Sequence, residues 1–161
     1  MIIAVTGHQR IPAAAQRFVR DGVRAYLASR AGVAEAAPVT LASCLAVGAD
    51  QIVASIALDL GCRLKAVIPA HGYETTFDDA GLASYRALLD RADETVTLDH
   101  GHPCGEAYMD AGRRIVDMCD ELLAVWDGFP ADGLGGTGDV VAYARRSGKP
   151  VRVVWPEGVR H

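Results

Sequence analysis

The chain has 161 residues, of which 50% are hydrophobic and 22% are charged, and its formal net charge is -4. A chain of this length buries roughly 70% of the surface that it exposes when unfolded, so we expect one domain, residues 1–161. The apolar content excludes a disordered chain. The apolar runs are far shorter than the ~20 residues of a membrane-spanning helix, so no membrane partner is expected. Met1 leads directly into an apolar strand without a basic leader, which indicates a cytoplasmic protein with no signal peptide.

The charge balance restricts the class of partner. There are 16 Lys and Arg residues against 20 Asp and Glu residues. Non-specific binding of nucleic acid needs a basic patch, so nucleic acid is not an expected partner. A small anion needs only one or two cations and some backbone N–H groups. The four cysteines are scattered with no CxxC pair, so we expect free thiols, no metal site and no cofactor; they are Cys44, Cys62, Cys104 and Cys119.

Apolar strand-like stretches alternate with stretches of helical periodicity along the whole chain. The predicted strands are 2–6, 39–45, 64–68, 94–98, 121–126 and 151–155. The predicted helices are 13–30, 49–60, 82–92, 106–119 and 139–146. This alternation predicts an α/β fold: a single-domain, Rossmann-like three-layer α/β/α sandwich with a mainly parallel sheet of about six strands. Residues 156–161 are expected to form a frayed end.

Ligands of open parallel sheets bind beyond the carboxyl ends of the strands, so the loops after the strands are the candidate site. After the first strand, Gly7 permits a sharp turn, and His8 and Arg10 are able to donate to an anion. The competing interpretation is an ordinary turn with a surface histidine and arginine.

The loops after the second and third strands contain further candidates. The second loop runs from Ser43 to Asp50, and Gly48 opens the next helix, whose N–H groups favour negative charge. Asp50 either caps that helix or binds a ribose hydroxyl. Tyr73, in the third loop, either covers a base or ribose or packs against its own loop.

The loop after the fifth strand has the most distinctive pattern. Three glycines and a threonine at a helix start are typical of a phosphate cradle; they are Gly135, Gly136, Thr137 and Gly138. The pattern is neither the GxGxxG fingerprint nor a P-loop. Gly128 begins the same loop. Asp127 and Asp139 are candidate general bases or ribose-hydroxyl acceptors, although Asp139 also suits a simple helix N-terminal charge.

Four segments in combination resemble the SLOG superfamily: 5–10, 45–50, 119–128 and 135–139. This superfamily includes the Rossmann domain of DNA processing protein A and the Lonely Guy phosphoribohydrolases, often named lysine decarboxylase-like proteins. The resemblance implies a Rossmann-like fold, a nucleotide or nucleotide-derived ligand, and self-association into a homo-oligomer. It does not specify an activity.

The catalytic motif of the Lonely Guy enzymes is matched only in part. Those enzymes cleave the N-glycosidic bond of nucleoside 5′-monophosphates with a PGGxGTxxE motif and an arginine on the preceding helix. Here one residue of the motif and the proline are missing, and Asp139 falls one position early. Arg113 or Arg114 would stand for the helix arginine.

Two functional hypotheses follow. The first is a cytoplasmic protein that binds a nucleotide or ribose phosphate, for instance as a sensor. The alternative is a phosphoribohydrolase, with Asp139 or Asp127 assisting water and Arg113 or Arg114 holding the substrate. A purely structural protein is disfavoured because the unusual residues gather at one edge of the predicted sheet.

Overall fold

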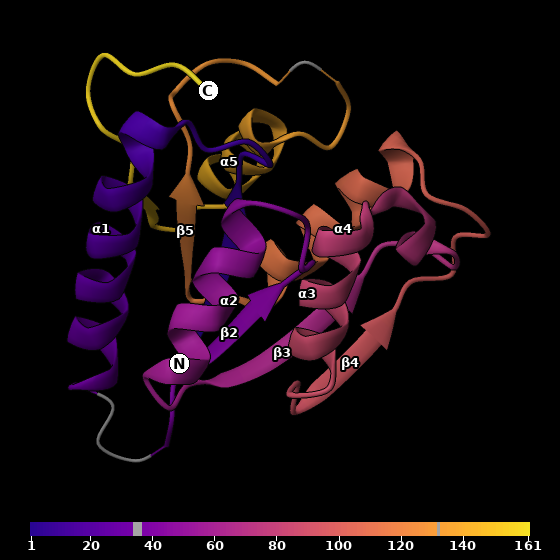
Figure 1. The fold of residues 1–161 in the computed structure, drawn as a ribbon, viewed down its shortest axis with the longest axis horizontal. Helices are drawn as coiled ribbons and strands as arrows, with labels where there is room; N and C mark the ends of the chain where they lie inside the picture. Colours follow the sequence, from indigo (N-terminus) through magenta and orange to yellow (C-terminus); the bar gives the residue numbers. More distant parts are fainter. Residues whose placement is uncertain (34–36, 132) are drawn as a thin grey trace.

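The computed structural model describes residues 1–33, 37–131 and 133–161, and it shows an α/β fold built on one parallel sheet (Figure 1). Every strand pairing is parallel, and the strand order is β4-β3-β2-β1-β5-β6. The strands are β1 (Ile2–Gly7), β2 (Thr40–Ser43), β3 (Arg63–Ile68), β4 (Glu94–Thr97), β5 (Glu121–Val125) and β6 (Val151–Val153). The predicted fold class is therefore confirmed.

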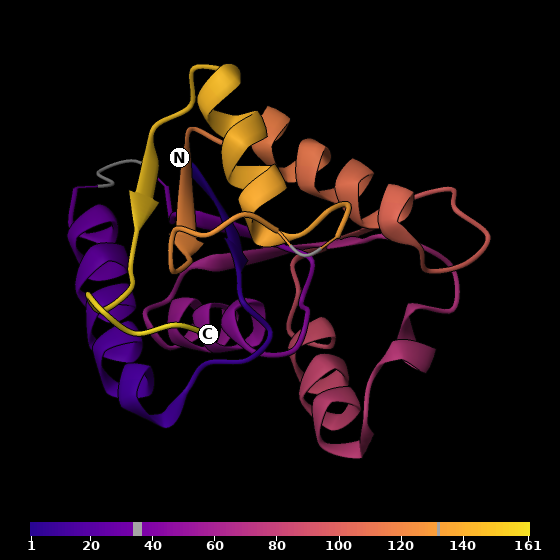
Figure 2. The same ribbon diagram turned by 90° about the horizontal axis from the view of Figure 1, so that it is seen from above.

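Helices cover both faces of the sheet. They are α1 (Ala13–Ala31), α2 (Ala49–Asp59), α3 (Asp79–Leu89), α4 (Gly105–Met118) and α5 (Thr137–Arg146), with a short 3₁₀ turn, η1 (Tyr73–Thr76). Figure 2 shows α1, α2 and α3 on one face and α4 and α5 on the other. Each predicted helix is present, but α5 begins two residues earlier than expected, which places Thr137 and Gly138 in its first turn.

The alternation of side chains along the strands explains this three-layer arrangement. On β1, Ile3 and Val5 belong to the apolar core that also contains residues of α1 and α2, whereas Ala4 belongs to the core that contains residues of α4 and α5. The α4–α5 side of the sheet also carries the fully buried Ala42 and Ala124. Small side chains on this face allow α4 and α5 to lie close to the strands.

The topology creates one position where a ligand site is expected. Strand β1 pairs with β2 on one side and with β5 on the other. The chain therefore runs outward from β1 through β2, β3 and β4, and then crosses back to β5. In open α/β sheets, ligands bind beyond the carboxyl ends of the strands at such a reversal.

The segment after β6 is ordered, so the expectation of a frayed end is wrong. The N–H of Val154 donates to the carbonyl of Ala124 at 2.9 Å, and the indole N–H of Trp155 donates to the carbonyl of Val159 at 2.6 Å. The segment ends over the carboxyl end of β5 (Figure 1), where the imidazole of His161 stacks on that of His8 with 3.7 Å between the ring centroids. Short-range patterns do not reveal these contacts because they join residues distant in sequence.

Two simpler expectations concern cysteines and membranes. All four cysteines are free thiols, and Cys62 and Cys119 are buried. Burial raises the pKa of both of these thiols. Within the described part of the chain, no helix is long and apolar enough to cross a membrane.

Candidate functional site

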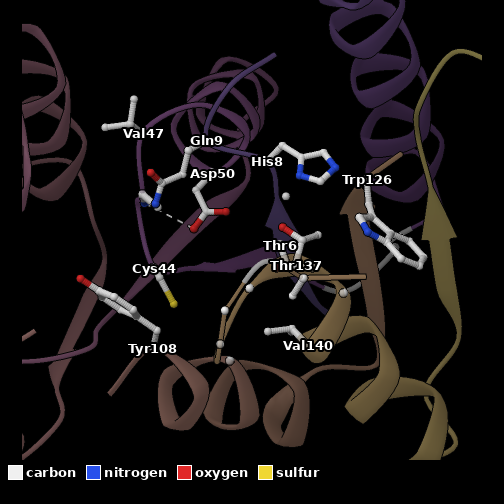
Figure 3. Close-up of a pocket in the computed structure, with 18 of the residues that line it drawn as sticks. Thr6, His8, Gln9, Cys44, Val47, Asp50, Tyr108, Trp126, Thr137 and Val140 are labelled. Atoms are coloured by element: carbon white, nitrogen blue, oxygen red, sulfur yellow. Dashed lines mark hydrogen bonds between the residues drawn. The ribbon is translucent and has the colours of Figure 1, made fainter. Parts of the chain in front are cut away.

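A cavity of about 610 Å³ lies beyond the carboxyl ends of the central strands. Its wall comes from the ends of β1, β2, β3 and β5, from one side of α4, and from the glycine-rich loop that leads into α5. Nine of the predicted ligand-binding residues line it: Gly7, His8, Arg10, Asp50, Tyr73, Gly135, Gly136, Thr137 and Gly138. Figure 3 shows Asp50, Thr6 and Thr137 around the same space.

The first turn of α5 forms the floor of the cavity. Gly136 is the N-cap residue, and Thr137 and Gly138 follow it. The first N–H groups of any α-helix have no partner within the helix and carry a partial positive charge. Thr137 adds a hydroxyl group to this edge. The arrangement is suited to hold an anion such as phosphate.

Packing against α4 is enough to explain why residue 135 is a glycine, without reference to a ligand. Gly135 has a backbone φ angle of +82°, which residues other than glycine rarely adopt. A Cβ atom at this position would lie 2.7 Å from the backbone nitrogen of Met109 on α4. The N–H of Gly135 also donates to the carboxylate of Asp139 at 3.1 Å. The loop is therefore held tightly against α4.

Asp50 is the buried acid of the site. It lies in the first turn of α2 with 6% of its surface exposed. Burial raises the pKa of its carboxyl group to about 7, although hydrogen bonds from Ala46, Ser43 and Cys44 act in the opposite direction. The N–H of Ala46 donates to the carboxylate at 3.4 Å. Asp50 thus binds the loop before the helix, while Gly48 occupies the N-cap position.

Two residues of the second loop support the site from outside the cavity wall. Ser43 is fully buried, and its Oγ accepts a hydrogen bond from the N–H of Leu45 at 3.0 Å. Gly48 has φ +86°, and a Cβ atom there would lie 2.3 Å from the carbonyl oxygen of Gln9. Gly48 therefore allows the β1–α1 and β2–α2 loops to meet, as the hydrogen bond from Ala49 N–H to the His8 carbonyl at 3.0 Å also shows.

Several packed aromatic side chains form the side wall of the cavity near η1. Tyr73 is 5% exposed and makes edge-to-face contacts with Phe77 at 5.0 Å and with Tyr85 at 5.7 Å between ring centroids. Burial raises the pKa of the Tyr73 hydroxyl far above its ordinary value, so this side chain stays neutral. Tyr73 thus packs within its own region and also faces the cavity, together with Tyr108 of α4.

The four residues predicted as catalytic lie outside the described cavity wall. The carboxylate of Asp139 accepts from Gly135. Arg113 forms an ion pair with Asp110 at 3.3 Å and has half of its side chain exposed. Arg114 is exposed on α4. Gly128, a predicted ligand-binding residue, also lies outside this wall.

Asp127, the fourth of these residues, lies behind two histidines. Its Oδ1 is 3.0 Å from Nε2 of His8, its Oδ2 is 2.6 Å from Nδ1 of His161, and only 1% of its side chain is exposed. The backbone N–H groups of Phe129 and His161 donate to the same carboxylate at 3.1 and 3.3 Å. Burial raises the pKa of Asp127, but these hydrogen bonds and the nearby His8 outweigh it, so the pKa lies well below its ordinary value.

The role of His161 was not predicted from the sequence. His8 and Asp127 are 119 positions apart, and His161 lies in a segment without regular secondary structure. Only the pairing of β1 with β5 brings the first two together. Both histidines line the cavity, whereas Asp127 does not.

The cavity has little positive charge of its own. Among the described residues that line it, Arg10 is the single arginine, and there is no lysine. An anionic ligand would therefore depend on Arg10, on the α5 N–H groups and on the histidines.

No protein-family model matches the chain, and no curated protein matches it either. Solved structures do share its fold. DNA processing protein A from Helicobacter pylori, described for its single-stranded DNA binding mode, aligns with a TM-score of 0.66 at 14% identity, over 95% of this chain and 64% of that one. The Streptococcus pneumoniae protein of the same name aligns with a TM-score of 0.67 at 18% identity, over 94% of this chain and 49% of that one.

A third structure, TM1055, aligns with a TM-score of 0.56 at 12% identity, over 93% of this chain and 71% of that one. The chain thus spans about half to two thirds of the two DNA processing protein A chains. These identities are low, so the likeness is one of fold. At that level, the resemblance to DNA processing protein A expected from the sequence is confirmed.

Proposed function

We propose that the protein binds a nucleotide or a ribose phosphate in the cavity beyond the carboxyl ends of its strands. The observation that carries this proposal is that the first turn of α5 and Arg10 line one cavity at the reversal of strand order. Its volume of about 610 Å³ lies within the roughly 300–1,000 Å³ typical of small-molecule sites.

The distribution of polar groups supports the same ligand class. A phosphate group would accept hydrogen bonds from the first turn of α5, at Thr137 and Gly138, and would be neutralised by Arg10. The polar side chains of Thr6 and Asp50 line the same cavity and suit hydroxyl groups of a ribose. The aromatic wall at Tyr73 offers an apolar surface for a base.

Hydrolysis of the N-glycosidic bond is the less supported alternative. It assigns the chemistry to Asp139 or Asp127 and to Arg113 or Arg114. Asp139 and Asp127 are engaged in hydrogen bonds beside the cavity, and the two arginines lie on the exposed side of α4. Binding without turnover therefore agrees better with the geometry.

A thermal-unfolding screen tests the proposal. The purified protein is heated with AMP, ADP-ribose, ribose 5-phosphate, inorganic phosphate or adenosine. A ligand at about 100 times its dissociation constant adds about 2.7 kcal/mol to the free energy of unfolding, which raises the melting temperature measurably. We expect stabilisation by phosphorylated ribosides and less by adenosine.

Matched arginine variants locate the binding. Arg10→Gln should weaken binding of the phosphorylated ligand at least about tenfold, because a charge-assisted hydrogen bond contributes roughly 1.5–3 kcal/mol. Arg20→Gln, an exposed change on α1, should leave the affinity unchanged. Equal affinities in the two variants, or no stabilisation by any phosphorylated riboside, would contradict the proposal. Chromatography of the same samples detects released base, and its appearance would favour the hydrolase.

A further inference from the structure

The His8–Asp127–His161 cluster brings together ligand atoms of the kinds that transition metals prefer. It offers two imidazole nitrogens and one carboxylate, and the three ligand atoms all lie within 4.8 Å of one another. Zinc lies about 2.0–2.2 Å from such atoms, so neighbouring ligands of a tetrahedral ion are ~3.3 Å apart. Here Nε2 of His8 lies 3.0 Å from Oδ1 of Asp127, and Nδ1 of His161 lies 2.6 Å from the other oxygen, Oδ2. The two imidazoles are stacked, with 3.7 Å between ring centroids and 10° between ring planes, so one ion is bound only if the ring of the part-exposed His161 turns to aim its nitrogen at it.

We propose that His8, Asp127 and His161 form a binding site for a divalent ion of the zinc class. Histidine nitrogen and carboxylate oxygen are established zinc ligands. The expectation of no metal site, which rested on the spacing of the cysteines, did not consider this cluster because its members are distant in sequence.

The charge of the cluster favours a cation. The Asp127 carboxylate is 1% exposed, and its ion-pair partners among the described residues are the two histidines, with no lysine or arginine. A buried carboxylate is costly unless a positive charge compensates it. The hydrogen bonds to this carboxylate already stabilise its negative charge, and a divalent ion would add a full positive charge beside it.

The surroundings hold the carboxylate in place for an ion. The N–H groups of Phe129 and His161 donate to its two oxygens at 3.1 and 3.3 Å. A carboxylate has about four lone-pair positions, so it can keep these bonds while it ligates a metal. Such outer hydrogen bonds orient metal ligands and typically strengthen metal binding by about 10–100-fold.

The position of the cluster leaves one coordination position of the ion open to the cavity. His8 and His161 both line the cavity, while Asp127 lies behind them. Three protein ligands with a fourth position left for water or substrate are typical of catalytic zinc sites, in contrast to closed structural sites. The fourth ligand would therefore come from the cavity: a water molecule or an oxygen of a bound anion.

Titration of the metal-free protein with Zn²⁺ alone tests the site, with no nucleotide present. Isothermal calorimetry should show one ion per chain. Co²⁺, used as a spectroscopic probe, should give visible absorption bands of a four-coordinate site. Asp127→Asn and His161→Gln should each weaken the affinity at least about tenfold, because each removes a direct ligand.

The control is a second histidine–carboxylate pair among the described residues, His100 and Asp110. His100 lies 2.9 Å from Asp110, but that carboxylate already pairs with Arg113, and within the described residues no third ligand group completes a metal cluster there. His100→Gln should leave zinc binding unchanged. His161 has a third of its side chain exposed, so His161→Gln is expected to fold, which far-ultraviolet circular dichroism checks.

Two results would overturn the proposal. One is wild-type protein that binds Zn²⁺ no more tightly than folded His161→Gln. The other is one-to-one binding that survives both ligand substitutions, which would place the ion elsewhere. Because the titration contains no nucleotide, its failure leaves the proposed function standing, and failure of the nucleotide screen leaves the metal site standing.

Discussion

Folding buries the carboxyl group of Asp50, and this burial raises its pKa from 3.8 to about 7. A folded state with the higher pKa binds more protons than the unfolded chain between these two values. The contribution of Asp50 to the free energy of unfolding is therefore fully present at low pH and is lost as the pH rises from about 4 through 7. One pKa unit corresponds to about 1.4 kcal/mol, so the loss amounts to at most about 4 kcal/mol.

We predict that Asp50→Asn removes this pH dependence. The amide does not ionise, so the stability of wild type relative to the variant should fall between about pH 4 and pH 7. Urea unfolding at several pH values measures the difference. Asp59→Asn, at the other end of α2 with a half-exposed carboxylate, is the matched surface control. A constant difference between wild type and Asp50→Asn would refute the prediction.

His8 shows the limit of prediction for a single residue. Its position after β1 marked it as a candidate, and it does line the cavity. Its partners were not foreseeable, because Asp127 and His161 reach it only through strand pairing and through the path of the segment after β6. Local patterns identify where unusual residues occur, whereas tertiary contacts decide what each one touches.

At the scale of elements, the hydrophobic periodicity predicted each strand and α-helix of the described residues, with errors at their ends, but not the 3₁₀ turn η1. Helix α3 illustrates the reason: the carboxylate of Asp78 accepts from the N–H of Gly81 at 2.7 Å, and this cap starts the helix at Asp79 instead of Leu82. Helix α5 starts at Thr137 because the carbonyl of Gly136 accepts from the N–H groups of Asp139 and Val140 at 3.1 and 3.2 Å. Helix ends depend on such individual hydrogen bonds, which the apolar pattern does not encode.

The loop before α5 provides a test at this scale. Gly135→Ala introduces a side chain at φ +82° and places Cβ 2.7 Å from the Met109 backbone nitrogen. A non-glycine residue in this region costs about 1–3 kcal/mol, and the clash adds to it. We therefore expect a loss of at least about 1 kcal/mol in the free energy of unfolding, together with weaker binding of phosphorylated ligands.

The same loop contains its control. A Cβ atom at Gly133 would meet nothing within 4 Å, so Gly133→Ala should change stability by less than about 0.5 kcal/mol. Chemical denaturation compares the two variants. Equal stabilities would mean that the loop relaxes away from α4 at no cost, contrary to the tight packing inferred from the structure.

The molecule as a whole is acidic, and its cations are dispersed. At least seven of the 16 lysines and arginines form ion pairs with carboxylates: Arg17, Arg24, Arg30, Arg63, Lys65, Arg86 and Arg113. Binding of single-stranded DNA relies on a positively charged groove with aromatic platforms. Among the described residues lining the cavity, Arg10 alone is an arginine or lysine.

We therefore predict that this chain does not bind single-stranded DNA, although it shares the fold of DNA processing protein A. Non-specific complexes have dissociation constants of about 10⁻⁴–10⁻⁶ M and weaken steeply with salt, because binding releases counterions from the phosphates. Fluorescence anisotropy of a labelled oligothymidylate should stay flat at micromolar protein, at both low and physiological salt. A saturable rise that weakens with salt would contradict this. Loss of that rise in Arg10→Gln but not in Arg20→Gln would then place the strand in the cavity, since the two changes remove the same charge and differ only in where it lies.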